Sequence, residues 1–169
     1  SDTHALHILG RILCDGKSSR FHRKIVDQGL ASSLFMYDFP FKDNGLFITY
    51  AFLTPNTDHQ KVEDIILNEY TSIKTEGVEQ KELDRAIAQT KATVAFSRDG
   101  SYAVASALNE AIAIGDWQFY TTYLDKIKSV TVKDIKKVAK KYLHDDASTT
   151  GWFCLLYTSD AADERRGVD

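Results

Sequence analysis

The chain has 169 residues, of which 43% are hydrophobic and 27% charged, the composition of a folded globular domain rather than of a disordered segment. Its formal net charge of −3 gives no sign of the basic surface that binds nucleic acid or an anionic membrane. No apolar run has the length of a membrane span, and the two cysteines, Cys14 and Cys154, do not define a disulfide framework. We therefore expect neither nucleic acid nor a membrane segment.

The first part of the chain predicts two helices followed by two strands. Apolar residues in the range 5–13 form a face broad enough for a helix buried against a sheet. Ser18 or Ser19 is expected to cap a second helix. The ranges 30–39 and 46–53 predict antiparallel strands, joined by a connection at residues 40–44. One face of the second strand carries Leu46, Ile48, Tyr50 and Phe52.

The middle of the chain predicts three helices from apolar residues three and four apart. These stripes run over residues 62–73, 83–94 and 102–112. Residues 97–101 interrupt the pattern and include a glycine, which predicts a kink or a break between the second and third of these helices. Gly115 predicts a clean end to the third, because glycine readily adopts the left-handed conformation that closes a helix.

The last part predicts two further helices and a returning strand. Asp116 is expected to cap a helix over residues 117–127. Thr131 and Asp134 form a capping-box pattern before the apolar stripe of residues 135–142, whose lysines predict a solvated opposite face. A last strand is expected at Thr149 to Phe153. Strands grouped early and helices grouped late predict an α+β fold, a largely antiparallel sheet with helices packed on one face.

Few residues suggest chemistry. His4 and His7 are three apart on one helix, but the sequence places no acidic third ligand near them, so structural histidines are the favoured interpretation. Solvated side chains are the expectation for His22, His59 and His144. Ser18, Ser19 and Arg20 next to His22 do not amount to a nucleophile with a positioned base. We predict no catalytic, cofactor-binding or metal-binding residue in this segment.

Several short motifs, taken in order, resemble a known family. They are HALHILGRILCDGKSSRFHRKIVDQGLA near the start, then LNEAIAIGDW, LDKIKSVTVKDIKKVAKKYL and TTGWF. Over residues 3–153 this order is similar to the non-catalytic half-domain of pitrilysin/insulinase-type zinc metallopeptidases. Within the second motif we interpret Glu110, Asp116 and Trp117 as marking the end of a helix and, for the tryptophan, a core anchor.

The resemblance implies that the parent protein is a zinc metalloendopeptidase acting on peptides or unfolded segments. Its zinc would be held by an HxxEH motif and a later glutamate in an upstream half-domain, and HxxEH is absent from this sequence. This segment would shape the proteolytic chamber beside that half-domain and further half-domains of the same chain, and would be inactive alone. The alternative is a catalytically silent family member that acts as a structural or partner subunit.

Two features concern the extent of the domain. Ser1 in place of an initiator methionine, with a helical pattern already running at Ala5, indicates that the natural N-terminus lies upstream. CLLYTSDAADERRGVD, from Cys154 to Asp169, resembles the in-frame translation of a transposase sequencing adapter. We therefore predict one half-domain, a fragment over residues 1–153, followed by a non-native tail at 154–169.

Overall fold

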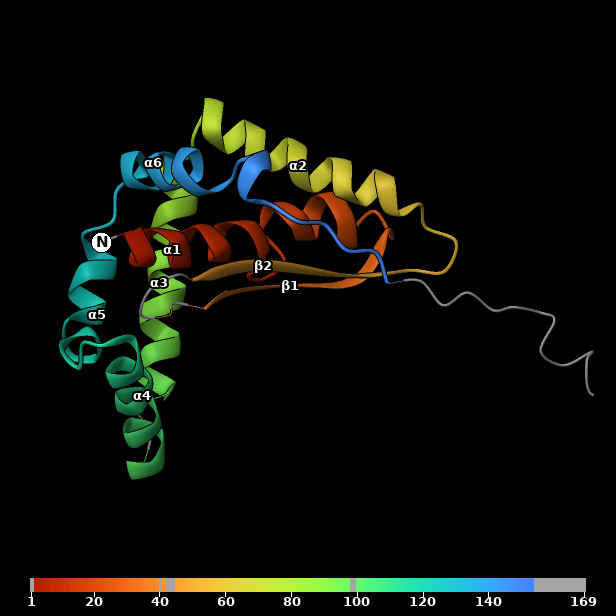
Figure 1. The fold of residues 1–169 in the computed structure, drawn as a ribbon. Coiled ribbons are helices and arrows are strands. Elements are labelled where there is room, and N and C mark those ends of the chain that lie inside the picture. The colour runs from red at the N-terminus through yellow and green to blue at the C-terminus, as the bar shows by residue number, and fades with distance from the viewer. Residues whose placement is uncertain (1, 40, 42–44, 98–99, 154–169) are drawn as a thin grey trace, which may run out of the picture.

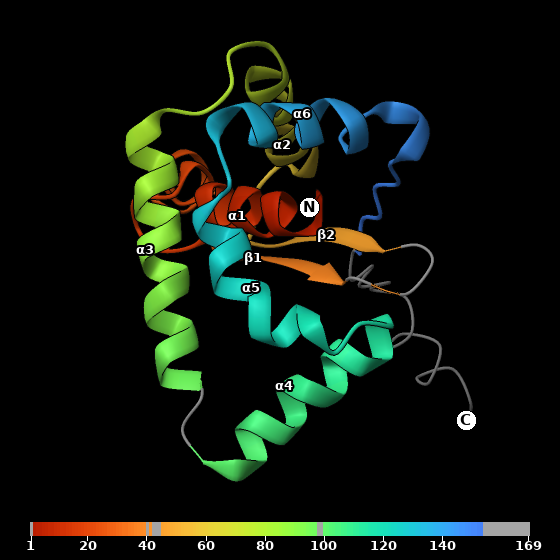
Figure 2. The same cartoon turned by 90° about the vertical axis from the view of Figure 1, so that its left-hand side faces the viewer.

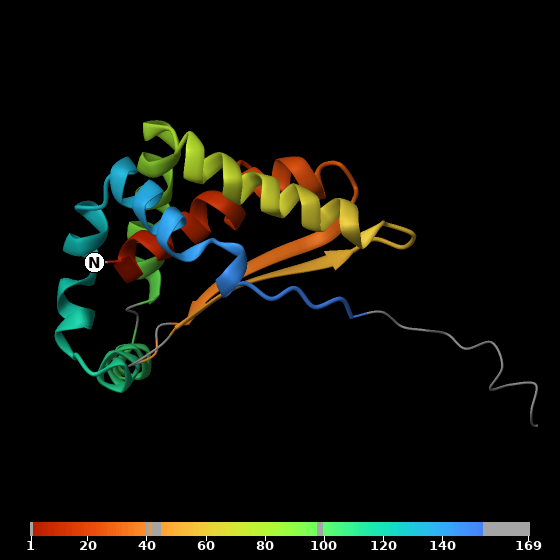
Figure 3. The same ribbon diagram turned by 45° about the horizontal axis from the view of Figure 1, so that its top comes forward.

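The computed structural model describes residues 2–39, 41, 45–97 and 100–153. It confirms the α+β class, because α1, α2 and α6 lie on one side of an antiparallel pair of strands (Figures 1 and 3). The strands are β1 (Ala31–Phe39) and β2 (Leu46–Leu53). The helices are α1 (Asp2–Cys14), the π-helix η1 (His22–Val26), α2 (His59–Thr75), α3 (Gln80–Ser97), α4 (Ser101–Ile114), α5 (Gln118–Lys128), α6 (Val132–Tyr142) and the 3₁₀ turn η2 (Asp145–Ala147).

The sheet follows the predicted strands closely. Phe35 lies opposite Tyr50 and Tyr37 opposite Ile48, with one irregularity in the register between Ala31 and Ser33. The connection expected at residues 40–44 lies, apart from residue 41, outside the described part of the chain. Alternation along each strand directs one set of side chains to the helices and the other set to the opposite side of the sheet.

The core forms around α1, as its broad apolar face predicts. Ile8, Leu9, Ile12 and Leu13 are fully buried, in contact with a cluster that includes Ile135 and other residues of α6. From the sheet, Leu34, Met36, Phe47, Ala51 and Leu53 pack against this cluster. Burial of a large aliphatic side chain stabilises a fold by about 1.5–3 kcal/mol, so α1 holds the two layers together.

The helix boundaries at residues 97–131 agree with the predicted signals. α3 ends at Ser97 and α4 begins after Gly100, whose φ of 88° only glycine adopts readily. Gly115 closes α4 in the left-handed conformation, and the Asp116 carboxylate accepts the backbone N–H of Gln118 at 2.9 Å. Thr131 and Asp134 form the expected capping box at the start of α6. These signals act within a few residues and so do not depend on the rest of the fold.

Three expectations from the sequence were wrong. The first concerns the two serines before η1. Ser18 and Ser19 do not cap a helix: η1 follows Phe21 with no side-chain cap, and the Ser19 hydroxyl is buried without a hydrogen-bond partner among the described residues. The second is the last strand, because residues 149–153 form no strand. Side chains hold this segment instead. The Trp152 indole stacks on His59 at 5.2 Å and donates to Glu63 Oε2 at 3.1 Å.

The third error concerns Trp117, which is 56% exposed and is not a core anchor. It lies where α4 passes into α5, and Figure 2 shows α4 at the opposite end of the molecule from α6. On α4 only Ala111 is buried, while Tyr102 and Ile112 of the predicted stripe are exposed. The helical spacing of the apolar residues in α4 was therefore predicted correctly. Within the described chain, however, most side chains of this apolar stripe are not buried.

Candidate functional site

The Ser18 to His22 segment belongs to the structural framework. Arg20 donates from Nε and Nη2 to the two carboxylate oxygens of Glu82 at 2.8 and 2.7 Å, and its Nη1 lies 3.5 Å from Glu69 Oε2. Lys24 pairs with Glu69 from the solvent side. Both carboxylates are buried, so these pairs tie the segment before β1 to α2 and α3.

The pKa directions agree with this structural role. Burial is the largest single influence on the Glu82 carboxyl and acts to raise its pKa, but the hydrogen bonds from Arg20 and from the Glu79 backbone, together with the charges of Arg20 and Arg85, hold the pKa below its ordinary value. The same pairing raises the pKa of Arg20. Arg20 and Glu82 form an ionised, mutually neutralising pair, which gives no base for a serine. The nearby His22 is oriented toward another residue, because its Nδ1 lies 3.1 Å from Asp27 Oδ1.

The two histidines of α1 do not converge. His4 is 7% exposed, and its ring lies 4.9 Å from that of Phe119 and 5.6 Å from that of Tyr123. Burial, with a further contribution from the charge of Lys126, lowers the pKa of His4 to about 4. His4 is therefore a neutral part of the packing between α1 and α5 at ordinary pH.

His7 lies in a polar cluster that the sequence did not predict. Its Nδ1 is 3.2 Å from Asp38 Oδ1 on β1, and Arg11 Nε donates to its Nε2 at 3.2 Å. Arg11 also pairs with Asp15 at 2.5 Å. Because Nε2 accepts a hydrogen bond, the ring carries its proton on Nδ1 and donates it to Asp38. The only sequence signal was Asp38 itself, the one charged residue of β1.

This cluster does not fit zinc. Both ring nitrogens of His7 are engaged, and the guanidinium group beside Nε2 repels a second cation. Across the described parts of the chain, no group of three or more His, Cys, Asp or Glu side chains is placed to hold a metal ion. The prediction that this segment supplies no metal ligand therefore remains a prediction, supported by the contacts of His7 and the packing of His4.

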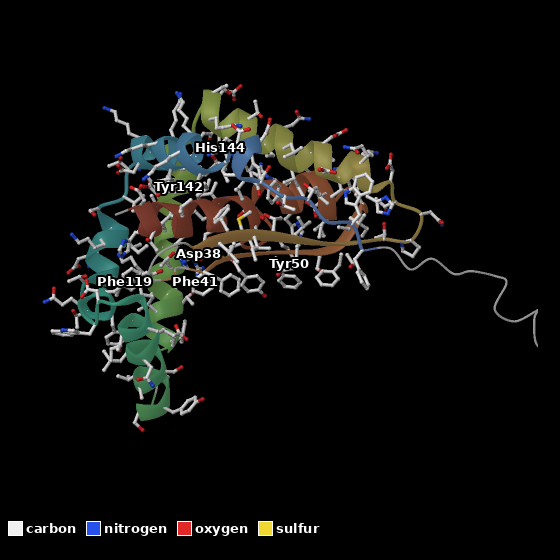
Figure 4. All side chains as sticks on the ribbon, viewed as in Figure 1. Asp38, Phe41, Tyr50, Phe119, Tyr142 and His144 are labelled. Atoms are coloured by element: carbon white, nitrogen blue, oxygen red, sulfur yellow. The ribbon has the colours of Figure 1, made fainter. Side chains whose placement is uncertain are left out.

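A large apolar surface occupies the face of the sheet turned away from α1 (Figure 4). We call it the aromatic face. Aromatic rings pair across the two strands, with ring centroids 6.0 Å apart for Phe35 and Phe52 and 6.1 Å apart for Tyr37 and Tyr50. Each of its side chains is 40–57% exposed. The aromatic face consists of Phe35, Tyr37, Phe39, Phe41, Leu46, Tyr50 and Phe52.

A second feature adjoins this face. A cavity of about 210 Å³ lies between α1 and β1, and we call it the α1–β1 cavity. Gly10 and Cys14 line it from the helix and Met36 from the strand, while Asp15 and Asp38 bring carboxylates to it. Burial raises the pKa of the Cys14 thiol to about 11, so this cysteine is a protonated, unreactive part of the wall.

Among the helices that the structure describes, none combines the length and apolar character needed to cross a membrane.

Comparison with known proteins identifies the domain type. The family model of the peptidase M16 inactive domain matches residues 1–90. The zinc protease PqqE of Helicobacter pylori is 30% identical over 150 residues, covering 88% of this chain and 34% of the relative. A mitochondrial-processing peptidase subunit beta from Lentinula edodes is 31% identical over 132 residues, covering 76% of this chain and 28% of the relative. The chain thus spans about a third of the length of these curated relatives.

Solved structures agree. A protease from Helicobacter pylori superposes with a TM-score of 0.80 at 28% identity, over 86% of this chain and 35% of that one. The inactive peptidase domain of a protein from Bordetella parapertussis superposes with a TM-score of 0.78 at 28% identity, over 88% of this chain and 80% of that one. The sequence resemblance is therefore confirmed: this chain belongs to the M16 family of peptidases and has the fold of the family's inactive domain.

Proposed function

We propose that this domain forms a non-catalytic wall of a peptidase chamber, with a zinc-binding half-domain supplied by another part of the parent protein. The observation that carries the proposal is the aromatic face, which is exposed while the helices α1, α2 and α6 cover the other side of the sheet. A surface of this kind contacts polypeptide segments that have lost their own fold.

The physical argument rests on area and chemistry. An aromatic side chain can bury about 150–250 Å² on contact, and the largest apolar patch of a monomeric protein rarely exceeds a few hundred Å². Six aromatic rings on one sheet face therefore indicate a surface that is used. Rings also tolerate many partner sequences, because contact with them is non-directional compared with buried hydrogen bonds.

The comparisons support the same arrangement. Relatives named as zinc proteases are about three times as long as the matched segment, and the matching family model is described as an inactive domain. The residues of this chain would then bind and position a peptide, and the zinc of the other half-domain would supply the hydrolytic chemistry. No residue of this chain is assigned to the chemical step.

Long-read sequencing through the locus on both sides of this segment is the first test. We expect an upstream half-domain with HxxEH and a later glutamate, in frame with residue 1. An intact upstream half-domain without those ligands would contradict the peptidase proposal. It would favour a catalytically silent family member that acts as a structural or partner subunit.

A metal assay on this chain tests the division of roles. We expect no stoichiometric zinc after dialysis and no hydrolysis of unfolded peptide substrates. Zinc bound one to one together with hydrolysis, both lost when His4 and His7 are replaced, would contradict the assignment of the chemistry to another half-domain.

Peptide binding by the aromatic face can be measured directly. The probe is a fluorescein-labelled, permanently unfolded polypeptide, followed by fluorescence anisotropy. Replacing both Tyr37 and Tyr50 by serine is expected to weaken binding about tenfold, because two central rings are lost from the contact. Tyr102→Ser is the matched control, since Tyr102 is 87% exposed on α4 and lies outside the aromatic face. Equal affinity of the double variant and the control would contradict the proposal.

A further inference from the structure

His4 is a polar group without a partner in an otherwise aromatic contact between α1 and α5. It is 7% exposed, and neither ring nitrogen has a hydrogen-bond partner among the described residues. The rings of Phe119 and Tyr123 lie 4.9 and 5.6 Å from it, and we call these three residues the α1–α5 joint. Contacts within this segment already bury the ring, so its burial persists in a longer chain.

The choice of histidine at this place calls for an explanation. Most buried polar side-chain atoms in folded proteins are hydrogen-bonded, and an unpaired one is destabilising. A phenylalanine would pack between the same rings without that cost. What histidine adds is the ability to take up a proton in mild acid.

The two halves of α5 are held differently. Near its C-terminal end Ile127 is fully buried in the core, and Val130 joins the same cluster just beyond the helix. The N-terminal half packs on α1 through Phe119 and Tyr123, whose rings also lie 5.6 Å from each other. Figures 1 and 2 show α5 beside the first turns of α1, with α4 leading away from the core. The α1–α5 joint therefore links the N-terminal half of α5, and through it α4, to α1.

None of the ionisable groups near the joint is hydrogen-bonded to the His4 ring. They are Asp2 and His7 on α1, Tyr123 and Lys126 on α5, Asp134 and Lys137 on α6, and Asp38 on β1, which faces His7. The two nearest carboxylates are engaged elsewhere, because Asp2 accepts a hydrogen bond from Lys141 at 2.7 Å and Asp134 belongs to the capping box of α6. A proton on His4 would therefore place an unpaired charge inside the joint.

We infer that protonation of His4 opens the α1–α5 joint and releases residues 101–123 from α1, while the rest of the core stays folded. The open form exposes the ring to water, which solvates its positive charge, so acid favours the open form. This response is a property of the fold and does not depend on the proposed function.

Hydrogen exchange followed by mass spectrometry tests the inference on the whole chain at pH 7.5 and pH 5.0. Exchange of an unfolded reference corrects for the intrinsic effect of pH on the rates. The opening equilibrium of peptides from residues 101–123 should rise about twentyfold in acid, because the ring has an ordinary pKa of 6.5 when exposed and about 4 when packed. Peptides from α6, which carries the buried Ile135, should change less than about twofold.

Variants of the joint identify the group that titrates. His4→Phe keeps a ring in the joint and removes the titration, and the acid response of residues 101–123 should fall below about twofold. His4→Leu is a second apolar variant for the same measurement. His7→Gln is the matched control, because the His7 ring also lies near Tyr123, at 5.9 Å, and this variant should keep the full response. Circular dichroism at pH 7.5 establishes that each variant is folded.

The result that supports the inference is an acid response confined to residues 101–123 and lost in both His4 variants. An equal response in His4→Phe and His4→Leu would overturn the role of His4, and its loss in His7→Gln alone would assign the titration to His7. A rise of similar size in α6 would show that the molecule opens as a whole, which would overturn the local opening.

Discussion

His4 couples the stability of the fold to pH, because the ring is packed between aromatic side chains and resists protonation. Its pKa falls from 6.5 to about 4 on folding. The unfolded chain therefore binds more protons than the folded chain between these values, and stability is lost as the pH falls from 6.5 toward 4. Above pH 6.5 the ring is neutral in both states and the loss vanishes.

The prediction for His4 is a variant with reduced acid sensitivity. Between pH 7.5 and pH 4.5, His4 should account for a loss of about 2–3 kcal/mol in the free energy of unfolding, since one pKa unit corresponds to about 1.4 kcal/mol. His4→Phe should recover most of that loss in urea titrations at the two pH values. His144→Gln, at an exposed position, should behave as the parent chain. Equal losses in parent and His4→Phe would contradict the assignment.

The buried pair of Arg20 and Glu82 gives a second prediction at this scale. Glu82→Met leaves the Arg20 guanidinium group with the 3.5 Å contact to Glu69 and a 3.4 Å hydrogen bond to the Gly77 carbonyl, and should lower the free energy of unfolding by about 3 kcal/mol. Adding Arg20→Met should cost less than the sum of the single changes, because no uncompensated charge then remains in that pair. Lys128→Met, at an exposed pair, should cost at most about 1 kcal/mol.

Additive effects of the Arg20 and Glu82 changes in chemical denaturation would contradict the coupling. They would mean that the two side chains contribute to stability through their separate packing, despite hydrogen bonds of 2.7 and 2.8 Å between them.

At the scale of elements, the capping box of α6 is the clearest local signal. Thr131 accepts the N–H of Asp134, and the Asp134 carboxylate accepts the N–H of Thr131 at 2.9 Å. The Thr131 hydroxyl also donates to the Asp134 carboxylate at 2.6 Å, and this bond, followed by the one from the Thr131 N–H, holds the pKa of Asp134 below its ordinary value. The helix carries Ile135 and Val138 into the core, so its start matters for the packing on α1.

Thr131→Ala should lower the free energy of unfolding by about 1 kcal/mol, the usual cost of losing an N-cap side chain. The measurement is urea denaturation at neutral pH. Thr122→Ala on α5 is the matched control, because its hydroxyl bonds only a carbonyl within its own helix, and it should change stability by less than about 0.5 kcal/mol. An equal effect at both positions would contradict a capping role.

Other elements show where local signals stop. The stripe on α4 was predicted from its spacing, but burial of that stripe depends on what lies opposite, and only Ala111 is covered. Thr149 to Phe153 has strand-like composition, yet strand formation requires a free edge in register, and here the Trp152 contacts with His59 and Glu63 hold the segment instead.

At the scale of the whole molecule, the adapter-like tail at residues 154–169 lies outside the described residues, and we expect it to contribute nothing to the fold. Its deletion should shift the midpoint of thermal unfolding by less than about 2 °C. A longer deletion starting at Thr149 also removes Trp152 and should lower the midpoint by about 3–6 °C, since a stacked and hydrogen-bonded indole is lost. A large effect of the shorter deletion would show that the tail is part of the domain.

The sequence alone determined the helix and strand periods, the breaks at Gly100 and Gly115, the cap at Thr131 and, by resemblance, the family. Each of these depends on residues close together in the chain, where spacing and backbone preference decide the outcome. Only the tertiary structure decided which apolar stripes are buried and which charges meet. Asp38 reaches His7 across 31 positions and Arg20 reaches Glu82 across 62. Such contacts follow from the packing of α1 between the sheet and the other helices, which no local pattern encodes.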